Sequence, residues 1–238
     1  MEIVKVENLR KIYHQDALEI QALSGINLSL ESGEFTVVAG PSGSGKSTLL
    51  NLIGGLDRPT EGRILLAGED ITRLGKGRLS HLRLNKIGFV FQSYNLIPVL
   101  TAYENAEFIL LLQGMPYQKR RQHVMELLEE VGLKGLENRR PYEMSGGQQQ
   151  RVAVARALAS NPDLVLADEP TANLDSKTGL ALIDMMLDMN KTRGVTFLIS
   201  THDTRVMDKA RRVILLRDGQ ISSDVRIGES LAQNSASP

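Results

Sequence analysis

Strand-like spacing of apolar residues dominates the first part of the chain. Residues 2–9 alternate between apolar and polar side chains, and residues 19–30 do so less strictly, which predicts antiparallel strands joined by a turn around residues 13–18. The apolar run at residues 34–39 predicts a short buried strand. A helix is expected to follow, from residue 46 to about residue 54.

Short apolar runs recur through the rest of the chain and alternate with helical patterns. The further predicted strands cover residues 62–68, 87–91, 163–167, 195–200 and 212–216. Helical periodicity at residues 145–160 and 176–192 separates the last three of these strands. Strands that alternate with helices favour a mostly parallel sheet covered on both faces, so the sequence predicts an α/β fold.

One long segment differs from this alternation. Residues 92–140 show helical periodicity with acidic and basic faces, which indicates a helical subdomain inserted into the α/β core. We therefore expect a single domain over residues 1–221, with its core at 1–91 and 141–221. Residues 222–238 are rich in Ser, Asn and Ala, which is typical of a flexible tail.

Composition narrows the functional classes. The 238 residues include 28 basic and 28 acidic side chains, so no net charge favours a nucleic acid, which we do not expect as a partner. The chain has no cysteine, which excludes disulfides, thiol catalysis and cysteine-based zinc sites. The first residues lack a signal-peptide pattern, and no stretch approaches the roughly 18 apolar residues of a membrane span. We expect a soluble, intracellular protein that reaches a membrane only through a partner.

A glycine-rich loop directly after residues 34–39 has the composition of a phosphate-binding site. Gly43 and Gly45 allow backbone conformations in which several N–H groups point at one anion, and the following helix adds the positive end of its dipole. Lys46 would reach the β and γ phosphates, and the Ser47 hydroxyl suits Mg²⁺. An ordinary Gly/Ser turn is the alternative. The predicted phosphate-binding residues are Gly40, Ser42, Gly43, Ser44, Gly45, Lys46, Ser47 and Thr48.

Two adjacent carboxylates end the predicted strand at residues 163–167. The carboxyl edge of a parallel sheet opens onto the ligand crevice, so Asp168 and Glu169 would face the phosphates. Asp168 can hold Mg²⁺ through water, and Glu169 can orient and deprotonate an attacking water. Taken alone, adjacent acids at a strand end are also common as helix caps or solvated turn residues.

A second anion site is predicted at the start of the helix at residues 145–160. Ser145 can cap this helix, while Gly146 and Gly147 leave the backbone before Gln148 accessible, and a helix N-terminus favours negative charge. A simple helix cap would give the same pattern.

Two further polar residues follow predicted strands. His202 comes after residues 195–200, beside Asp203, where it could contact the γ phosphate or the attacking water. Gln92 ends the strand at residues 87–91 and begins the helical segment, so it could sense Mg²⁺ and water while moving with that segment. Both could instead be structural residues at strand ends.

These motifs occur in the order found in the ATP-binding-cassette (ABC) ATPases, which the chain resembles from its start to about residue 220. The resemblance adds the aromatic residue Tyr13 and the segment at residues 172–175. It implies the P-loop ABC ATPase fold, in which a mostly parallel RecA-like core sheet is joined by an antiparallel β subdomain and an inserted α-helical subdomain. It also implies an ATPase that uses ATP and Mg²⁺.

The same resemblance implies that two copies of the chain form a dimer, and it assigns a role in ATP binding or hydrolysis to each of the motif residues. Tyr13 would stack on adenine, and Ser145, Gly146, Gly147 and Gln148 would bind the ATP held by the partner chain. Asp175 would couple the two sites. Two ATP molecules would then lie between the protomers of a homodimer. Glu169, His202 and Gln92 would be catalytic, and Ser47, Gln92 and Asp168 would surround Mg²⁺.

A narrower resemblance rests on residues 54–62, 87–98 and 145–151, which look like the lipoprotein-release (LolD-like) and macrolide-exporter (MacB-like) branch. It implies a polytopic membrane permease of the MacB or LolC–LolE type as partner. The ATPase would sit at the cytoplasmic side of the inner membrane. Residues 94–105 are similar to the surface that docks such partners, although they could simply pack within the subdomain.

The expected function is ATP hydrolysis that powers export, lipoprotein release or mechanical force transmission. Two alternatives belong to other classes: a soluble ATP-driven switch acting on DNA or ribosomes, and an ATP-binding scaffold of the cell-division type. The sequence leaves the cargo open among lipoproteins, drugs, peptides and haem.

Overall fold

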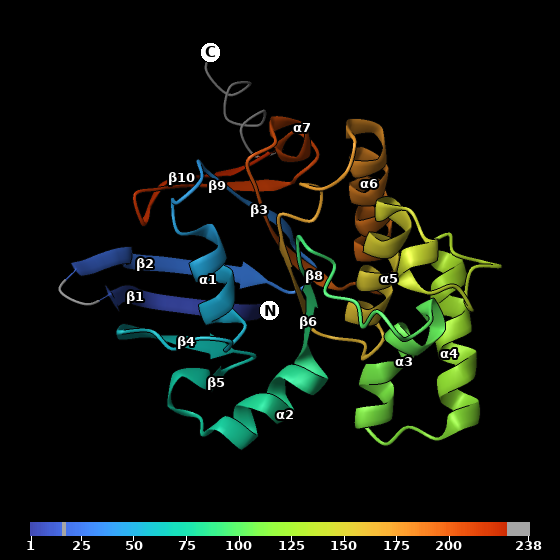
Figure 1. The fold of residues 1–238 in the computed structure, drawn as a ribbon. Coiled ribbons are helices and arrows are strands. Elements are labelled where there is room, and N and C mark those ends of the chain that lie inside the picture. The colour runs from blue at the N-terminus through green and yellow to red at the C-terminus, as the bar shows by residue number, and fades with distance from the viewer. Residues whose placement is uncertain (16–17, 228–238) are drawn as a thin grey trace, which may run out of the picture. The chain divides into compact units, whose positions relative to one another are not determined.

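The computed structural model describes residues 1–15 and 18–227, which divide into two compact units (Figure 1). The first unit combines residues 1–74 with the described residues from 196 onward, and the second unit comprises residues 75–195. Each unit is described separately.

An antiparallel sheet forms one part of the first unit, with strand order β2-β1-β4-β5. Its strands are β1 (Glu2–Gln15), β2 (Leu18–Glu31), β4 (Glu61–Leu66) and β5 (Glu69–Asp70). The register places Val4 opposite both Leu30 and Leu66, and all three side chains are buried. The alternating pattern thus predicted the strands correctly, although β5 was not predicted. The turn predicted around residues 13–18 is shorter than expected, because β1 continues to Gln15 and β2 begins at Leu18, with these two residues paired. Residues 16–17 lie outside the described residues.

The first unit also contains three parallel strands, and the predicted phosphate loop follows the central one, β3. Strand β3 (Phe35–Ala39) lies between β8 (Thr196–Thr201) and β9 (Arg212–Arg217) and runs parallel to both. Every residue of β3 and β8 is buried, as expected for parallel strands covered on both faces. The helical elements of this unit are α1 (Lys46–Ile53), the 3-10 turn η1 (Ile71–Arg73) and α7 (Thr204–Met207).

The predicted tail begins too early. Strand β10 (Gln220–Arg226) continues past residue 222 and pairs antiparallel with β9, with Asp224 opposite Ile214. The sequence analysis did not predict β10 because its Ser and Asp residues interrupt any apolar pattern. Backbone pairing with β9 and an ion pair hold this strand in place. Residues 228–238 of the predicted tail lie outside the described residues.

The second unit contains a pair of parallel strands and most of the helices. Strand β6 (Ile87–Val90) pairs with β7 (Leu164–Asp168). Helices α3 and α4 form a hairpin that begins after residue 92, within the segment expected to be helical (Figure 1). The helical elements of this unit are α2 (Lys76–Lys86), α3 (Ala102–Leu112), α4 (Tyr117–Glu130), η2 (Pro141–Glu143), α5 (Gly146–Leu158) and α6 (Ser176–Arg193). The boundaries of the helical subdomain stay a prediction.

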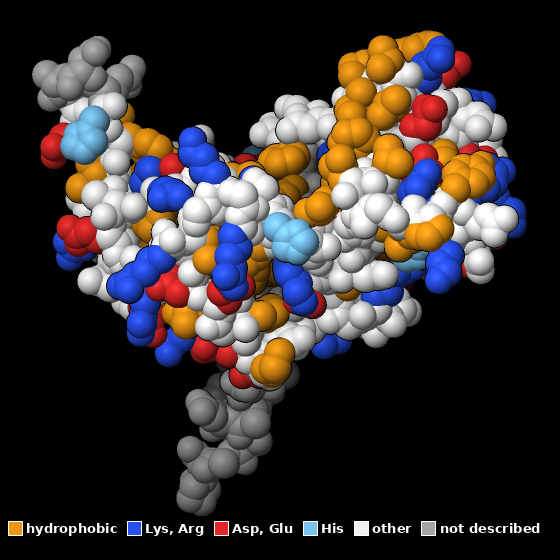
Figure 2. All heavy atoms as spheres, turned by 90° about the horizontal axis from the view of Figure 1, so that it is seen from below, with side chains coloured by type: hydrophobic (Ala, Val, Ile, Leu, Met, Phe, Trp, Pro, Cys, Tyr) orange, Lys and Arg blue, Asp and Glu red, His pale blue; other side chains and the backbone are white. Residues whose placement is uncertain are grey.

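The surface is mixed in charge. Lys and Arg side chains are interspersed with Asp and Glu on the face drawn in Figure 2. Among residues 1–15 and 18–227, no helix is both long enough and apolar enough to cross a bilayer.

A buried arginine fastens β10 to the rest of the first unit. Arg212 is 7% exposed, and its guanidinium donates to both carboxylate oxygens of Asp224, at 2.8 and 2.7 Å. It also donates to Glu34 Oε2 at 3.0 Å and to the Ser29 carbonyl at 2.8 Å. Asp224 raises the pKa of Arg212, so the charge persists despite burial.

We predict that Arg212→Met lowers the free energy of unfolding by about 3 kcal/mol, because it leaves the half-buried Glu34 carboxylate without this partner. Arg226→Met is the matched control: it removes a 2.8 Å ion pair to the same Glu34 from an exposed side chain, and should cost less than about 1 kcal/mol. Urea unfolding of the full chain measures both. Equal losses for the two variants would contradict this account of Arg212.

Candidate active site

The predicted phosphate loop connects β3 to α1 and is shaped by its glycines. A Cβ atom on Gly45 (φ +103°) would lie 2.6 Å from the Ala22 carbonyl oxygen, so only glycine fits there. A Cβ atom on Gly43 (φ +80°) would meet no atom within 4 Å, so this part of the loop faces open space. The two glycines thus differ: Gly45 permits close packing, and Gly43 provides left-handed backbone beside an open region.

The loop is held from both sides within the first unit. Lys46 is only 6% exposed, and its Nζ donates to the carbonyl oxygens of Gly40, at 2.8 Å, and Pro41, at 3.0 Å. On the other side, the Gly219 N–H donates to the Ser44 carbonyl at 3.1 Å, and the Gly219 carbonyl accepts from the Ser24 N–H at 2.8 Å. The turn between β9 and β10 therefore braces the loop, a role for Gly219 that the sequence analysis missed.

The residues of this loop fit a polyphosphate. No side chain caps α1, and no acidic residue lies in its first turn. The Ser44 hydroxyl is buried and has no hydrogen-bond partner. A helix N-terminus without a side-chain cap attracts anions, and a buried hydroxyl without a partner favours a ligand that supplies one.

Tyr13 lies near the same loop and is fixed at its hydroxyl. The hydroxyl donates to Asp57 Oδ2 at 2.9 Å, and the Lys11 Nζ lies 4.7 Å from the ring centroid. Burial and then Asp57 raise the pKa of Tyr13, whereas the Thr48 side chain acts in the opposite direction, which places Thr48 beside the phenol. Tyr13 is 39% exposed, so part of this residue is accessible to a ligand.

His202 reaches the edge of the sheet from which the phosphate loop starts. Strands β3 and β8 are parallel with Ala39 opposite Thr201, so Gly40 and His202 both follow at that edge. His202 is exposed. The next residue, Asp203, caps α7 through the Arg205 N–H, and an ion pair with Arg205 lowers the pKa of Asp203.

The second unit has a corresponding edge, where β6 and β7 end. Val90 lies opposite Ala167, so Gln92 follows one strand where Asp168 and Glu169 complete the other. Gln150, completely buried on α5, joins the two strand ends: its Nε2 donates to the Phe91 carbonyl at 3.3 Å and to the Pro170 carbonyl at 2.9 Å.

Glu169 has an unusual backbone. Its φ of +45° is in the left-handed region, which few residues other than glycine adopt. Such conformations cluster at functional sites, where the surrounding structure holds them. The adjoining turn is held in part by Asn173, whose Nδ2 donates to the Gln92 carbonyl at 3.0 Å.

The segment at Ser145 begins α5 with a capping box. The Ser145 hydroxyl accepts from the Gln148 N–H, and the Gln148 side chain accepts from the Ser145 N–H at 2.9 Å. Asp175 caps the neighbouring α6 through the N–H groups of Lys177 and Thr178, and the Thr178 side chain lowers the pKa of Asp175. The two helix starts touch, because a Cβ atom on Gly147 would lie 2.4 Å from Thr178 Cγ2.

The predicted site residues therefore form two groups. The first unit contains Tyr13, His202 and the phosphate loop, and the second contains Gln92, Asp168, Glu169, Asp175 and residues 145–148. Sequence reasoning missed Gln150 because its partners, 59 and 20 residues away, become neighbours only in the folded chain.

A family model described as "ABC transporter" matches residues 23–172, well over half of the chain. The chain belongs to the ABC transporter family. The resemblance inferred from its motifs is thus confirmed.

Named relatives place it more closely in this family. The lipoprotein-releasing system ATP-binding protein LolD 1 of Rhodopseudomonas palustris is 48% identical over 223 residues, which cover 93% of this chain and 99% of that protein. The macrolide export ATP-binding/permease protein MacB of Brucella melitensis is 45% identical over 222 residues, which cover 93% of this chain and 34% of MacB.

The fold of this chain matches that of a solved ATP-binding cassette. A dimeric, post-hydrolysis state of the ATP-binding cassette MJ0796 bound to ADP and Pi superposes with a TM-score of 0.88 at 44% identity, covering 94% of this chain and 99% of that one. The chain is an ATP-binding subunit of an ABC transporter, and it hydrolyses ATP. It belongs to the LolD/MacB branch, and the soluble-switch and scaffold alternatives are not favoured.

We predict that Gln150→Met lowers the free energy of unfolding by about 2–3 kcal/mol, because two carbonyls at the strand ends lose their donor in a buried setting. The neighbouring Gln149→Met is the control, since Gln149 is only half-buried and donates to one carbonyl, that of Met144, at 3.1 Å. Urea unfolding compares them, and a Gln149→Met loss as large as that of Gln150→Met would be evidence against this role of Gln150.

Proposed function

We propose that this ABC ATPase subunit closes as a homodimer around two ATP molecules and drives a membrane permease. The proposal rests on two helix starts in one chain that the sequence predicts to bind anions: the start of α1 in the first unit, which no side chain caps, and the start of α5 in the second, which the Ser145–Gln148 capping box closes in the absence of a ligand. The dimeric arrangement of the MJ0796 cassette is consistent with pairing of two such chains.

In this proposal the first unit supplies the residues that bind ATP. The backbone of Gly40, Ser42, Gly43, Ser44 and Gly45 surrounds the phosphates together with Lys46, Ser47 and Thr48, and Tyr13 stacks on the adenine. The Lys46 ammonium, now on two backbone carbonyls, exchanges part of that bonding for phosphate oxygens. Ser47, Asp168 and Gln92 would hold Mg²⁺, which when bound neutralises charge on the β and γ phosphates.

In this proposal, residues that follow the carboxyl ends of the parallel strands carry out ATP hydrolysis. Glu169 accepts the proton of the attacking water, and His202 holds that water against the γ phosphate. The left-handed φ of Glu169 and the Gln150 hydrogen bond to the Pro170 carbonyl hold the main chain that carries this side chain.

The second anion site acts on the partner chain. Ser145, Gly146, Gly147 and Gln148 bind the γ phosphate of the ATP held by the other protomer. Asp175 couples the two sites, because the start of α6 that it caps touches the start of α5 through Thr178 and Gly147. Movement of either helix start then disturbs the other.

The permease is proposed to be of the MacB or LolC–LolE type, with this subunit at the cytoplasmic side of the inner membrane. Residues 94–105 form the docking surface. Buried Asn105 fixes this segment through the Ile97 N–H, at 2.8 Å, and through the carbonyls of Ile97, Leu100 and Thr101. Val99 on the same segment is 73% exposed, as a docking residue needs to be.

We predict that Glu169→Gln lowers the rate of ATP hydrolysis by roughly 10²–10⁴-fold while ATP still binds, because the amide cannot accept the proton of water. Phosphate release measures turnover, and calorimetric titration measures binding. Lys46→Ala provides the contrast, since it should weaken ATP binding itself. Hydrolysis near the normal rate in Glu169→Gln would remove Glu169 from the role of general base.

A further inference from the structure

The tip of the α3–α4 hairpin exposes a stripe of apolar side chains. Phe108, Leu111 and Leu112 are spaced i, i+3 and i+4, so they lie on one face of α3. Leu111 is 53% exposed and Leu112 is 57% exposed, whereas the buried residues of α3 lie mostly on its other side. Tyr117, at the start of α4, is also exposed. These four residues are separate from those assigned to ATP binding, to hydrolysis or to the docking surface at residues 94–105.

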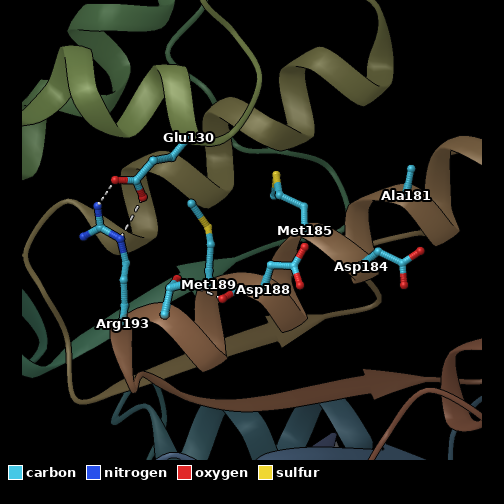
Figure 3. A pocket seen from close by; sticks show the side chains of 8 residues that line it. Glu130, Ala181, Asp184, Met185, Asp188, Met189 and Arg193 are labelled. Carbon is cyan, nitrogen blue, oxygen red and sulfur yellow. Dashed lines mark hydrogen bonds and ion pairs between the residues drawn. The ribbon is translucent and has the colours of Figure 1, made fainter.

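The hairpin that carries this stripe is held at both of its ends. At the tip, Arg120 of α4 pairs with Glu107 of α3 and donates to the Met115 carbonyl at 2.6 Å, which ties the two helices together. At the far end of α4, Glu130 accepts two hydrogen bonds from Arg193 of α6, at 2.9 and 2.8 Å (Figure 3). The apolar stripe is therefore presented before a partner arrives, which lowers the entropic cost of binding.

The surface next to the stripe is basic. Residues 108–125 contain Lys119, Arg120 and Arg121 and no acidic residue. Arg120 is already paired within the hairpin, so the excess charge is carried by Lys119 and Arg121, which are both exposed. Glu104, one turn before the stripe, closes the capping box of α3. The two exposed cations outweigh this one carboxylate.

Helix α2 extends the basic surface beside the tip. The Gln113 side chain donates to the Leu84 carbonyl at 3.2 Å and to Asn85 Oδ1 at 3.1 Å, which places the end of α2 next to the end of α3. Helix α2 has no acidic residue, and its basic residues are Lys76, Arg78, Arg83 and Lys86. Lys86 is paired with Asp163 at 2.8 Å and adds no net charge.

We propose that the hairpin tip binds the surface of a membrane that contains anionic lipids. Leu and Phe side chains enter the boundary between headgroups and acyl chains, Tyr favours the same interface, and neighbouring Lys and Arg attract anionic headgroups. Because the chain is a subunit of an ABC transporter, it acts at a membrane. The proposal shares only that position with the proposed function, and it depends neither on the permease nor on the ATP-bound dimer.

The test uses the full-length chain and vesicles of phosphatidylcholine, with or without phosphatidylglycerol, collected by sedimentation. The chain has no tryptophan, so Leu112→Trp adds a single fluorescent reporter to the stripe, and Leu18→Trp adds one at an exposed position in the first unit. The unmodified chain should sediment with the anionic vesicles and much less with the neutral ones. On binding, the emission of Leu112→Trp should shift to shorter wavelength, whereas that of Leu18→Trp should not.

A pair of variants measures the apolar contribution. Leu111→Ser/Leu112→Ser should bind the anionic vesicles roughly tenfold more weakly, because two side chains no longer enter the interface. Leu18→Ser/Ile227→Ser is the matched control, since it removes two similarly exposed apolar side chains from the first unit. It should stay within about twofold of the unmodified chain. All variants should keep the circular dichroism spectrum of the unmodified chain.

A second pair measures the electrostatic contribution. Lys119→Gln/Arg121→Gln should weaken binding to the anionic vesicles by roughly ten- to thirtyfold, the scale of two basic residues at an anionic surface. Arg10→Gln/Arg217→Gln is the matched control, because it removes two exposed charges from the first unit, and it should cost less than about threefold.

Three results would overturn the proposal. One is failure of the unmodified chain to sediment with the anionic vesicles. Another is equal weakening by the tip variants and their controls, which would mean general charge attraction. The third is an unshifted emission of vesicle-bound Leu112→Trp, which would mean that the stripe stays out of the bilayer and serves a protein partner. Each of these results would leave the proposed roles in ATP binding and hydrolysis untouched.

Discussion

The register of parallel strands determines where the candidate catalytic groups lie. Ala39 is opposite Thr201 in the first unit, and Val90 is opposite Ala167 in the second, so each strand pair ends level at its carboxyl edge. The residues that follow are Gly40 with His202, and Gln92 with Asp168 and Glu169. A shift of one residue in either pair would move one set of these residues along the sheet relative to the other and reverse which face its side chains occupy. The chemistry of this ABC ATPase therefore depends on the register of the buried strands that carry these residues.

Loops at these edges are held by buried polar side chains that donate to backbone carbonyls. Lys46 donates within the phosphate loop, Gln150 joins Phe91 to Pro170, and Asn105 fixes the segment that includes Val99. Each of these side chains is almost completely buried. Loops without regular pairing must satisfy their backbone groups in some other way, and these three residues do so while leaving neighbouring side chains exposed for binding.

Much of this could be predicted because the decisive patterns are local. The phosphate loop is recognisable from the spacing of its glycines and Lys46, and the predicted cap at Ser145 directly precedes a helical run. Gln150 and Gly219 could not be found, since their partners are distant in sequence. Strand β10 was missed for a related reason: Arg212 and backbone pairing hold it, rather than an apolar face. Family membership confirms the ATPase identity, whereas the individual roles of the site residues stay predictions.

In the proposed dimer the Ser145 helix start completes the phosphate site of a second chain. This arrangement is tested most directly by sedimentation of Glu169→Gln protein with ATP, alone and combined with Ser145→Asp or Ser145→Asn. Asp and Asn both cap helices well, but only Asp places a negative charge against the phosphate. We expect ATP-dependent dimers for Glu169→Gln and for the Asn variant, and monomers that still bind ATP for the Asp variant. Dimers of the Asp variant in ATP, or loss of ATP binding by its monomer, would contradict it.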